Sequence, residues 1–254
     1  MNSIAENVSL GSGTRMGHGV VIEDDVRIGD ECVIGHYVVI RSGSTLGNSV
    51  RIDDHASIGK LPMKAANSAV TKTKTLPGTE IGNGCIIGSG VVIYAGAKLS
   101  DGVLVADLAT IREDVSIGEK TILGRGVAIE NQCSIGSYCK LETNAYITAY
   151  STIEDYVFVA PGVLTSNDNF AGRSEERFKH FKGVTVRRGG RIGVGAVILP
   201  GCEIAEDGMA AAGSVVTKDI DIRTVVSGIP ARSIRAVEDD QLLDNQSWFD
   251  DSDG

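Results

Sequence analysis

An aliphatic residue recurs at every sixth position along most of the chain, in runs that cover 4–58, 81–165 and 192–216. In many repeats a small or β-branched residue follows four positions after the aliphatic one. Neither the 3.6-residue period of a helix nor the strict alternation of a long strand produces this spacing, whereas short strands separated by regular turns do. The pattern therefore predicts a parallel β-helix.

Three six-residue repeats are expected to make one triangular coil of 18 residues, so the chain should fold as an all-β stack of about ten coils. Residues 1–220 belong to this β-helix. Two polar stretches that lack the repeat, 60–79 and 166–191, are predicted to be inserted loops. Residues 221–254 are expected to form a C-terminal extension that caps the stack, with a turn signal at 227–230, a short helix and an acidic tail.

The composition fits a core of stacked aliphatic ladders, because aromatic residues make up only 5% of the chain while glycine occurs 32 times. The net charge is −9, but 238–254 holds seven acidic and no basic residues, so the remainder is nearly neutral and nucleic acid is not an expected partner. All five cysteines occupy small, inward positions and should be reduced. Because no signal peptide or membrane-length apolar segment is visible, we expect a cytoplasmic protein with no membrane partner.

Both predicted loops follow the same column of the stack. In the 18-residue register, six positions should lie one above another on one face: Ile58, Ile93, Ile111, Ile129, Ile147 and Thr165. The loops come directly after the first and the last of these, five coils apart, which is about 24 Å at ~4.8 Å per coil. Long loops on a rigid scaffold usually carry function, so the shared corner predicts a working cleft.

This corner also differs in the residue that follows the aliphatic position. At the other corners that residue is often glycine, which we interpret as the mark of tight turns with positive φ. In the column that bears the loops, the same position holds larger or polar side chains: Tyr94, Arg112, Glu130, Thr148 and Ser166. A ladder of chemically capable side chains is therefore predicted between the two loops.

The repeat resembles that of the hexapeptide-repeat acyltransferases, over about residues 4–235. Within it, the segment 157–169 (VFVAPGVLTSNDN) and the Lys- and Thr-rich insertion near residue 70 are similar to bacterial nucleotide-sugar N-acyltransferases of the dTDP-amino-sugar type. The resemblance implies a left-handed β-helix, a homotrimer, and acyl transfer from acetyl-CoA or another acyl-CoA to the amine of a nucleotide-linked 3- or 4-amino-dideoxyhexose. No metal is expected, because the histidines of the chain are not placed as a three-histidine site.

Three further segments resemble the coenzyme A end of these enzymes: 191–201 (RIGVGAVILPG), 212–219 (AGSVVTKD) and 227–232 (SGIPAR). The resemblance implies that the cosubstrate is bound by Gly195, Ala196, Gly213, Ser214, Lys218, Pro230, Arg232 and Arg235. Family members that act on 3-amino sugars often carry an aromatic-Glu-Gly turn one coil below the Asn-Asp pair, where this chain has 148–150 (TAY). A 4-amino sugar is therefore as well supported as a 3-amino sugar.

Transfer of an acyl group from a thioester to an amine requires a neutral, close amine, a donor for the oxyanion and a route for one proton. Asn167 and Asp168, at the root of the second loop, are the leading catalytic candidates, with His180 on the same loop as a candidate base. The substrate amine can also pass its proton to the departing thiolate. Further candidates for binding the acceptor lie on the same corner or on an adjacent corner that a threefold neighbour would supply: Glu130 and Asn131, and Asp107, Glu142 and Asn144.

Alternatives from other classes stay open. An O-acetyltransferase of a sugar or antibiotic would use His180 as an essential base. A non-catalytic β-helix scaffold is a third possibility, although a pure spacer needs no loops. Similar repeats occur in γ-class carbonic anhydrases, whose metal needs three histidines, whereas only His18 and His36 lie one coil apart here. They also occur in sugar nucleotidyltransferases, which carry a large N-terminal nucleotide-binding domain.

Overall fold

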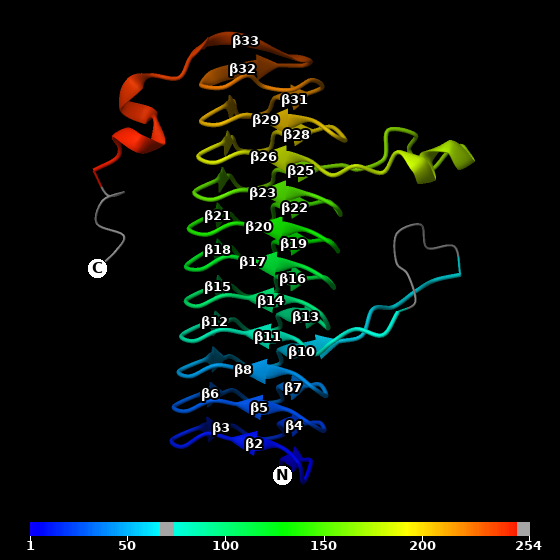
Figure 1. The fold of residues 1–254 in the computed structure, drawn as a ribbon, viewed down its shortest axis with the longest axis vertical. Helices are drawn as coiled ribbons and strands as arrows, with labels where there is room; N and C mark the ends of the chain where they lie inside the picture. Colours follow the sequence, from blue (N-terminus) through cyan, green and yellow to red (C-terminus); the bar gives the residue numbers. More distant parts are fainter. Residues whose placement is uncertain (67–73, 248–254) are drawn as a thin grey trace.

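The computed structural model describes residues 1–66 and 74–247 of the chain. These residues form a left-handed parallel β-helix, drawn upright in Figure 1 with the N-terminus at one end and β33 at the other. Three sheets, A, B and C, make the faces of the triangular stack. The predicted all-β, left-handed β-helix is confirmed.

Each sheet is built from every third strand, so that neighbours in a sheet are one coil apart in sequence. Sheet A consists of β1 (Ser3–Ile4), β4 (Val21–Ile22), β7 (Val39–Ile40), β10 (Ser57–Lys60), β13 (Val92–Tyr94), β16 (Thr110–Ile111), β19 (Ala128–Ile129), β22 (Tyr146–Ile147), β25 (Leu164–Thr165), β28 (Val197–Ile198) and β31 (Val215–Val216). Sheet B consists of β2 (Ser9–Leu10), β5 (Arg27–Ile28), β8 (Thr45–Leu46), β11 (Glu80–Ile81), β14 (Lys98–Leu99), β17 (Ser116–Ile117), β20 (Ser134–Ile135), β23 (Thr152–Ile153), β26 (Thr185–Val186) and β29 (Glu203–Ile204).

Sheet C closes the triangle and ends in a hairpin. It consists of β3 (Arg15–Met16), β6 (Val33–Ile34), β9 (Arg51–Ile52), β12 (Ile86–Ile87), β15 (Leu104–Val105), β18 (Ile122–Leu123), β21 (Lys140–Leu141), β24 (Phe158–Val159), β27 (Arg191–Ile192), β30 (Met209–Ala210), β32 (Thr224–Gly228) and β33 (Ala231–Ala236). Three short 3₁₀ helices lie outside the sheets: η1 (Glu175–Lys179), η2 (Asp239–Gln241) and η3 (Leu243–Asn245).

The residues that the six-residue repeat predicts to lie one above another are the residues that pair between neighbouring strands. Ile93 pairs with Ile111, Ile111 with Ile129 and Ile129 with Ile147, so the predicted column exists. The described sheets contain 11, 10 and 12 strands, slightly more than about ten coils imply. One added strand is β26, which lies inside the stretch 166–191 that was predicted to be a loop throughout. The others form the C-terminal hairpin.

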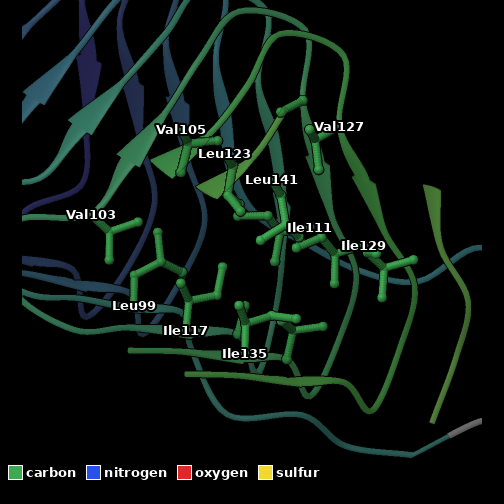
Figure 2. Packing of buried hydrophobic residues seen from close by; sticks show 14 of the residues in the cluster. Leu99, Val103, Val105, Ile111, Ile117, Leu123, Val127, Ile129, Ile135 and Leu141 are labelled. Carbon is green, nitrogen blue, oxygen red and sulfur yellow. The ribbon is translucent and has the colours of Figure 1, made fainter. Parts of the chain in front are cut away.

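The core is a set of aliphatic ladders that run the length of the stack. Figure 2 shows neighbouring rungs, in which Ile111, Ile129 and other aliphatic side chains meet inside the triangle. From β4 to β32 each strand buries its second residue, whereas Ile4 and Leu10 at the N-terminal end are exposed. Full burial of one such side chain stabilises the fold by about 1.5–3 kcal/mol. All five cysteines are free and buried. Burial raises the pKa of Cys133 and Cys139 to about 12, so both behave as small apolar groups.

Glycine is required at these corner positions for a different reason from the one predicted. A Cβ on Gly29 would lie 2.6 Å from the backbone of Gly47 in the next coil, so this position needs glycine because two coils approach closely. The positive φ angles fall two residues later instead, as at Glu31 (φ 55°), where several non-glycine residues adopt them. Stacking of coils therefore selects glycine here more than turn conformation does.

The C-terminal hairpin of β32 and β33 covers one end of the stack, as expected of a cap, and its antiparallel strands are joined through the turn at 229–230. After β33 the chain folds back along the corner between sheets B and C, where two short 3₁₀ helices replace the predicted helix. Within 1–66 and 74–247, no helix has the length and apolar character to cross a membrane.

Candidate active site

Both insertions leave the stack where sheet A turns into sheet B, as predicted, and project to the same side in Figure 1. The first follows β10 and the second follows β25, five strands farther along sheet A. We call the edge between them, formed by Tyr94, Arg112, Glu130, Thr148 and Ser166, the loop corner.

The side chains of the loop corner form a connected charged ladder. Arg112 donates to both oxygens of Glu113 at 2.8 and 3.0 Å, and its Nη1 lies 3.3 Å from Oε2 of Glu130. The guanidinium also lies 4.9 Å from the centre of the Tyr94 ring, within cation–π range. Because the Glu113 side chain is only 6% exposed, Arg112 supplies the countercharge that a buried carboxylate needs.

Glu130 is the carboxylate that this ladder presents to the second loop. Burial raises the pKa of Glu130; the positive charge of Arg112 opposes that rise and the negative charge of Glu113 adds to it. A carboxylate held in this balance can accept a proton more readily than a solvated one. Asn131, the next residue, is 1% exposed, and its Oδ1 has no hydrogen-bond partner among the described residues. A buried acceptor of this kind indicates a donor supplied by water or by a ligand.

A pocket of about 200 Å³ opens beside Glu130 at the root of the second loop. Its walls combine the loop corner with the loop: Glu130, Tyr146, Thr148, Ala149, Asn167, Asp168, Arg177 and Phe181. The structure thus brings together Glu130, Asn167 and Asp168, three of the residues expected to meet the acceptor. Within the described part of the chain, the Asn167 carboxamide makes no hydrogen bond and is available to a ligand.

Asp168 is already engaged within the loop. Its Oδ1 accepts a hydrogen bond from the Phe170 amide at 2.8 Å, and its Oδ2 accepts one from the Gly172 amide at 3.0 Å and lies 3.3 Å from Nη1 of Arg177. Desolvation acts to raise the pKa of Asp168, but these amides and the arginine outweigh it and hold the pKa below its usual value. The carboxylate therefore folds the loop root, and contact with the acceptor stays a prediction.

His180 lies outside the pocket, at the end of η1. Its Nε2 is 3.1 Å from Oε1 of Glu176, its ring stacks on Phe170 with centroids 5.8 Å apart, and its side chain is 55% exposed. Within one chain it does not reach the Glu130 carboxylate or line the pocket. The base role predicted for His180 remains untested.

The other three acceptor candidates lie on a different corner. Asp107, Glu142 and Asn144 follow strands β15 and β21, at the turn from sheet C to sheet A. Asp107 accepts a hydrogen bond from the Ser89 amide at 2.8 Å, as part of turn stacking. A single chain does not bring these residues to the pocket, so their predicted role depends on a neighbouring copy.

Lys218 and Arg232, two of the predicted coenzyme A residues, share a groove of about 210 Å³ at the C-terminal end. The groove lies between the last strand of sheet A and the hairpin, and Thr224, Ala231 and Ser233 also line it. Arg235 is not part of it, because its Nη1 lies 3.3 Å from Oε1 of Glu238. Asp219 and Asp221 line the same groove and balance the charge of the two cations, so the binding of a phosphate-bearing cosubstrate here stays a prediction.

The remaining predicted coenzyme A residues are divided between two places. Gly195 and Gly213 both have positive φ, at 64° and 67°, and stack at the turn from sheet C to sheet A, with open space where a Cβ would project. Ala196 and Ser214 follow them and are buried, and Ser214 Oγ has no partner in the described structure. Pro230 lies in the turn between β32 and β33. These residues do not join the groove of Lys218 and Arg232 in one chain.

His18 and His36 lie one above the other, as the register predicted, with ring centroids 5.4 Å apart and the rings tilted by 37°. His36 Nδ1 accepts the backbone N–H of His18 at 2.9 Å, so the pair serves the turn. In the described ranges no cluster of three His, Cys, Asp or Glu side chains has the arrangement of a metal site.

Sequence reasoning assigned no role to four residues that line the pocket: Tyr146, Ala149, Arg177 and Phe181. Tyr146 is the outward residue of β22, the strand that leads into the loop corner at Thr148. The repeat register was therefore sufficient to predict that Tyr146 lies next to the loop corner. Arg177 and Phe181 belong to the second loop, which has no period, and only the concentration of charged and aromatic residues in 177–181 pointed to them.

Comparison with known proteins identifies the class. A sequence model described as the hexapeptide repeat of succinyl-transferase matches residues 19–54 and 66–95. The solved UDP-N-acetylglucosamine acyltransferase of Francisella novicida has the same fold, with a TM-score of 0.55 and 19% identity over 92% of this chain and 68% of that one. The chain is thus a hexapeptide-repeat β-helix.

Curated relatives point the same way. The galactoside O-acetyltransferase of Escherichia coli (strain K12) is 35% identical over 103 residues, which are 39% of this chain and 49% of that protein. A chloramphenicol acetyltransferase of Escherichia coli is 28% identical over 126 residues, 47% of this chain and 60% of that protein. The chain thus spans about half the length of these relatives. The chain therefore carries the hexapeptide repeat and shares part of its length with acetyltransferases that are similar to it in sequence.

Proposed function

We propose that the protein is an acyltransferase that moves an acyl group from acyl-CoA to the amine of a nucleotide-linked amino sugar. The observation that carries the proposal is the pocket at the root of the second loop, where Glu130 and the free carboxamide of Asn167 face a common space. A carboxylate beside a neutral amide suits an ammonium group and sugar hydroxyls better than it suits an apolar acceptor.

In this mechanism Glu130 holds the acceptor amine and takes its proton, so that the neutral nitrogen attacks the thioester carbonyl. The attack forms the C–N bond and a tetrahedral oxyanion, whose collapse breaks the C–S bond, and the departing thiolate takes the second proton from the nitrogen. The Asn167 amide donates to the oxyanion or to a sugar hydroxyl, and Asp168 acts as a positioning residue that fixes Asn167 through the loop amides.

The cosubstrate is assigned to the C-terminal coils. Lys218 and Arg232 are placed to meet its phosphates, and the smooth turns at Gly195 and Gly213 leave room for a chain to pass along the stack. Because acyl-CoA is an intracellular metabolite, this proposal includes action in the cytoplasm.

The proposal also includes a homotrimer. The outward residues of sheet A are mostly apolar, among them Val39, Val92, Leu164 and Val197, whereas sheet B presents charged and hydroxyl side chains such as Arg27, Lys98 and Glu203 at the same register. A partly exposed apolar face on a rigid prism favours contact with another copy. Such a contact would allow a neighbour to complete the cleft.

O-acetyl transfer is the second candidate, and the named O-acetyltransferase among the relatives favours it. It would need a base for a hydroxyl group, and His180 is the histidine on the loop. Its exposed position and its contact with Glu176 make it less suited to this role than Glu130 within one chain.

The test is to incubate the purified protein with acyl-CoA and matched nucleotide sugars that carry an amine or a hydroxyl at ring position 3 or 4. Thiol release and product mass report turnover, and fragmentation locates the acyl group. N-acyl product formed only from the amines supports the proposal. An O-acyl product, or no turnover with any amine, contradicts it.

A further inference from the structure

A larger pocket lies on a different corner, where sheet B turns into sheet C and the C-terminal segment folds back over the stack. Its volume is about 560 Å³, within the range of small-molecule sites. It shares no lining residue with the pocket of Glu130. The walls are formed by Lys120, Tyr138, Lys140, Tyr156, Val157, Phe158, Gly189, Arg191, Asp207, Asp240, Gln241, Leu243 and Gln246.

One wall is aromatic and rigid. The rings of Tyr138 and Tyr156 stack with centroids 4.9 Å apart and an interplanar angle of 3°. Lys120 lies 5.4 Å from the centre of the first ring and Arg188 lies 5.9 Å from the centre of the second, so the pair is held between two cations. The two stacked rings therefore form one fixed wall of the pocket.

The floor is a strip on the outer face of sheet C. Strand register places Lys140, Phe158 and Arg191 one coil apart in a single row, with the aromatic ring between two cations. Phe158 is 38% exposed, much like other outward apolar residues of sheet C such as Ile122, so its ring is accessible from the pocket. A planar ring can lie on this platform while its charged group reaches either cation.

Arg191 gives the clearest sign of a missing partner. Its Nε and Nη2 are buried without a hydrogen-bond acceptor among the described residues, and its Nη1 makes only a long 3.5 Å contact with Gln241. No carboxylate of the described chain lies within ion-pair distance of it. Burial lowers the pKa of Arg191, with the charge of Asp207 opposing and that of Arg235 adding to the effect. An oxyanion would satisfy both unpaired N–H groups.

The far wall is held in place by the fold. Asp207 Oδ1 accepts the backbone N–H of Leu243 at 3.1 Å, and Asp244 accepts from Arg188 Nη1 at 3.0 Å. Leu243 is buried beneath this segment. Asp207 and Asp240 are the acidic residues of the lining, against the three cations Lys120, Lys140 and Arg191. The pocket is preformed and has a net positive lining.

We propose that this pocket binds a nucleoside phosphate, with the base on Phe158 against the tyrosine wall and the phosphate on Arg191 and Lys140. A nucleotide combines the two properties that the walls select, a planar ring and an oxyanion, and its size fits the volume. Two sources share this chemistry, the nucleotide half of a sugar nucleotide and the adenylate half of coenzyme A; if coenzyme A is the source, its phosphates bind here instead of at Lys218 and Arg232. The inference does not rest on acyl transfer.

Equilibrium binding to the full-length protein tests the proposal. Calorimetric titrations with dTDP, UDP, 3′,5′-ADP and coenzyme A identify the source, while thymidine and inorganic pyrophosphate each supply one half of the chemistry. We expect one of the nucleotides to bind saturably, at least tenfold more tightly than either half alone. Arg191→Gln should weaken that binding at least tenfold, and Phe158→Leu by a smaller factor.

Arg15→Gln is the matched control, because Arg15 holds the same outward position on β3 of sheet C, far from the pocket. It should bind like the wild type. Lys140→Gln changes an exposed side chain and should also weaken binding, which keeps the test valid if Arg191→Gln does not fold. The proposal is overturned if no nucleotide binds at about 1 mM, if pyrophosphate binds as well as the nucleotides, or if folded Arg191→Gln and Lys140→Gln both bind normally.

Discussion

Replacing Glu130 by glutamine is expected to lower kcat/KM for the amino-sugar acceptor about 100-fold near neutral pH. The substitution keeps the shape of the side chain and leaves an oxygen for Arg112, but it removes the charge that holds the ammonium and accepts its proton. A positioned acid or base contributes roughly 10²–10⁴ in rate. The expected hundredfold loss corresponds to about 2.7 kcal/mol of transition-state stabilisation.

The fold should tolerate this change. Arg112 keeps its two contacts with Glu113, and the contact that is weakened is a single 3.3 Å approach between side chains that are 18% and 26% exposed. Partly exposed ion pairs of this kind contribute at most about 1 kcal/mol. A free energy of unfolding within about 1 kcal/mol of the wild type would therefore separate catalysis from stability.

The dependence of the rate on pH provides a second measure. Glu130 must be ionised to accept a proton, and burial raises its pKa. The wild-type rate should therefore fall as the pH decreases through this raised pKa. Glutamine does not titrate, so Glu130→Gln should lose that acid limb.

The assay is steady-state thiol release at several pH values with the best amine acceptor. Glu119→Gln is the control, because Glu119 is exposed at a turn between sheets B and C. It should retain wild-type kinetics. If Glu130→Gln turns over at the wild-type rate with an unchanged pH profile, the pocket at the second loop is not where the amine reacts.

Three further outcomes are expected. Asp168→Asn should lower kcat/KM about tenfold or more, because the side chain loses the charge that faces Arg177 and can place a donor against the Gly172 amide. His180→Ala should have a smaller effect. The reverse order of the two effects in the same assay would favour O-acetyl transfer. Alanine at Lys218 or Arg232 should raise KM for acyl-CoA and leave KM for the sugar nearly unchanged, and a change confined to the sugar KM would refute the placement. Ile117→Ala should cost about 2–5 kcal/mol in chemical denaturation, because Ile117 is 1% exposed in the ladder, and a much smaller loss would mean that the ladder relaxes around the cavity.

The sequence was sufficient to predict the strand register because each coil contacts only its neighbours, so a one-dimensional period becomes a three-dimensional column. It placed Ile58 and Thr165 in one sheet and hence both loops on one corner. Where the period was interrupted, the prediction was weaker. Val186 keeps the phase of Ile192 and forms part of β26, but its isolated position in a polar stretch hid it. The interpretation of the corner glycines as positive-φ residues was wrong, because these positions are fixed by a contact between neighbouring coils, which the sequence of a single turn does not reveal.

The site was partly predictable for the same reason. Glu130 belongs to the loop corner, where the six-residue period holds, so its position close to Asn167 could be predicted by counting residues. The state of Asp168 did not, because the amides of Phe170 and Gly172 reach it through the conformation of a loop that has no repeat. Residues that a second copy would provide, such as Asp107, could be suggested from symmetry but not tested within one chain.

Association of the chains decides whether such a neighbour exists. Leu164, on the outer face of sheet A next to the second loop, has a 50% exposed side chain. If sheet A is the contact face, Leu164→Glu buries a charge in an apolar interface, which costs several kcal/mol per interface by desolvation, roughly enough to shift a trimer to monomer at micromolar concentration. Light scattering after size separation should show this loss of mass. Thr152→Glu is the control, since Thr152 takes the same outward position on sheet B and should leave the mass unchanged. A Leu164→Glu protein of unaltered trimer mass would place the contact on another face, and a wild-type monomer with full activity would remove the need for a shared cleft.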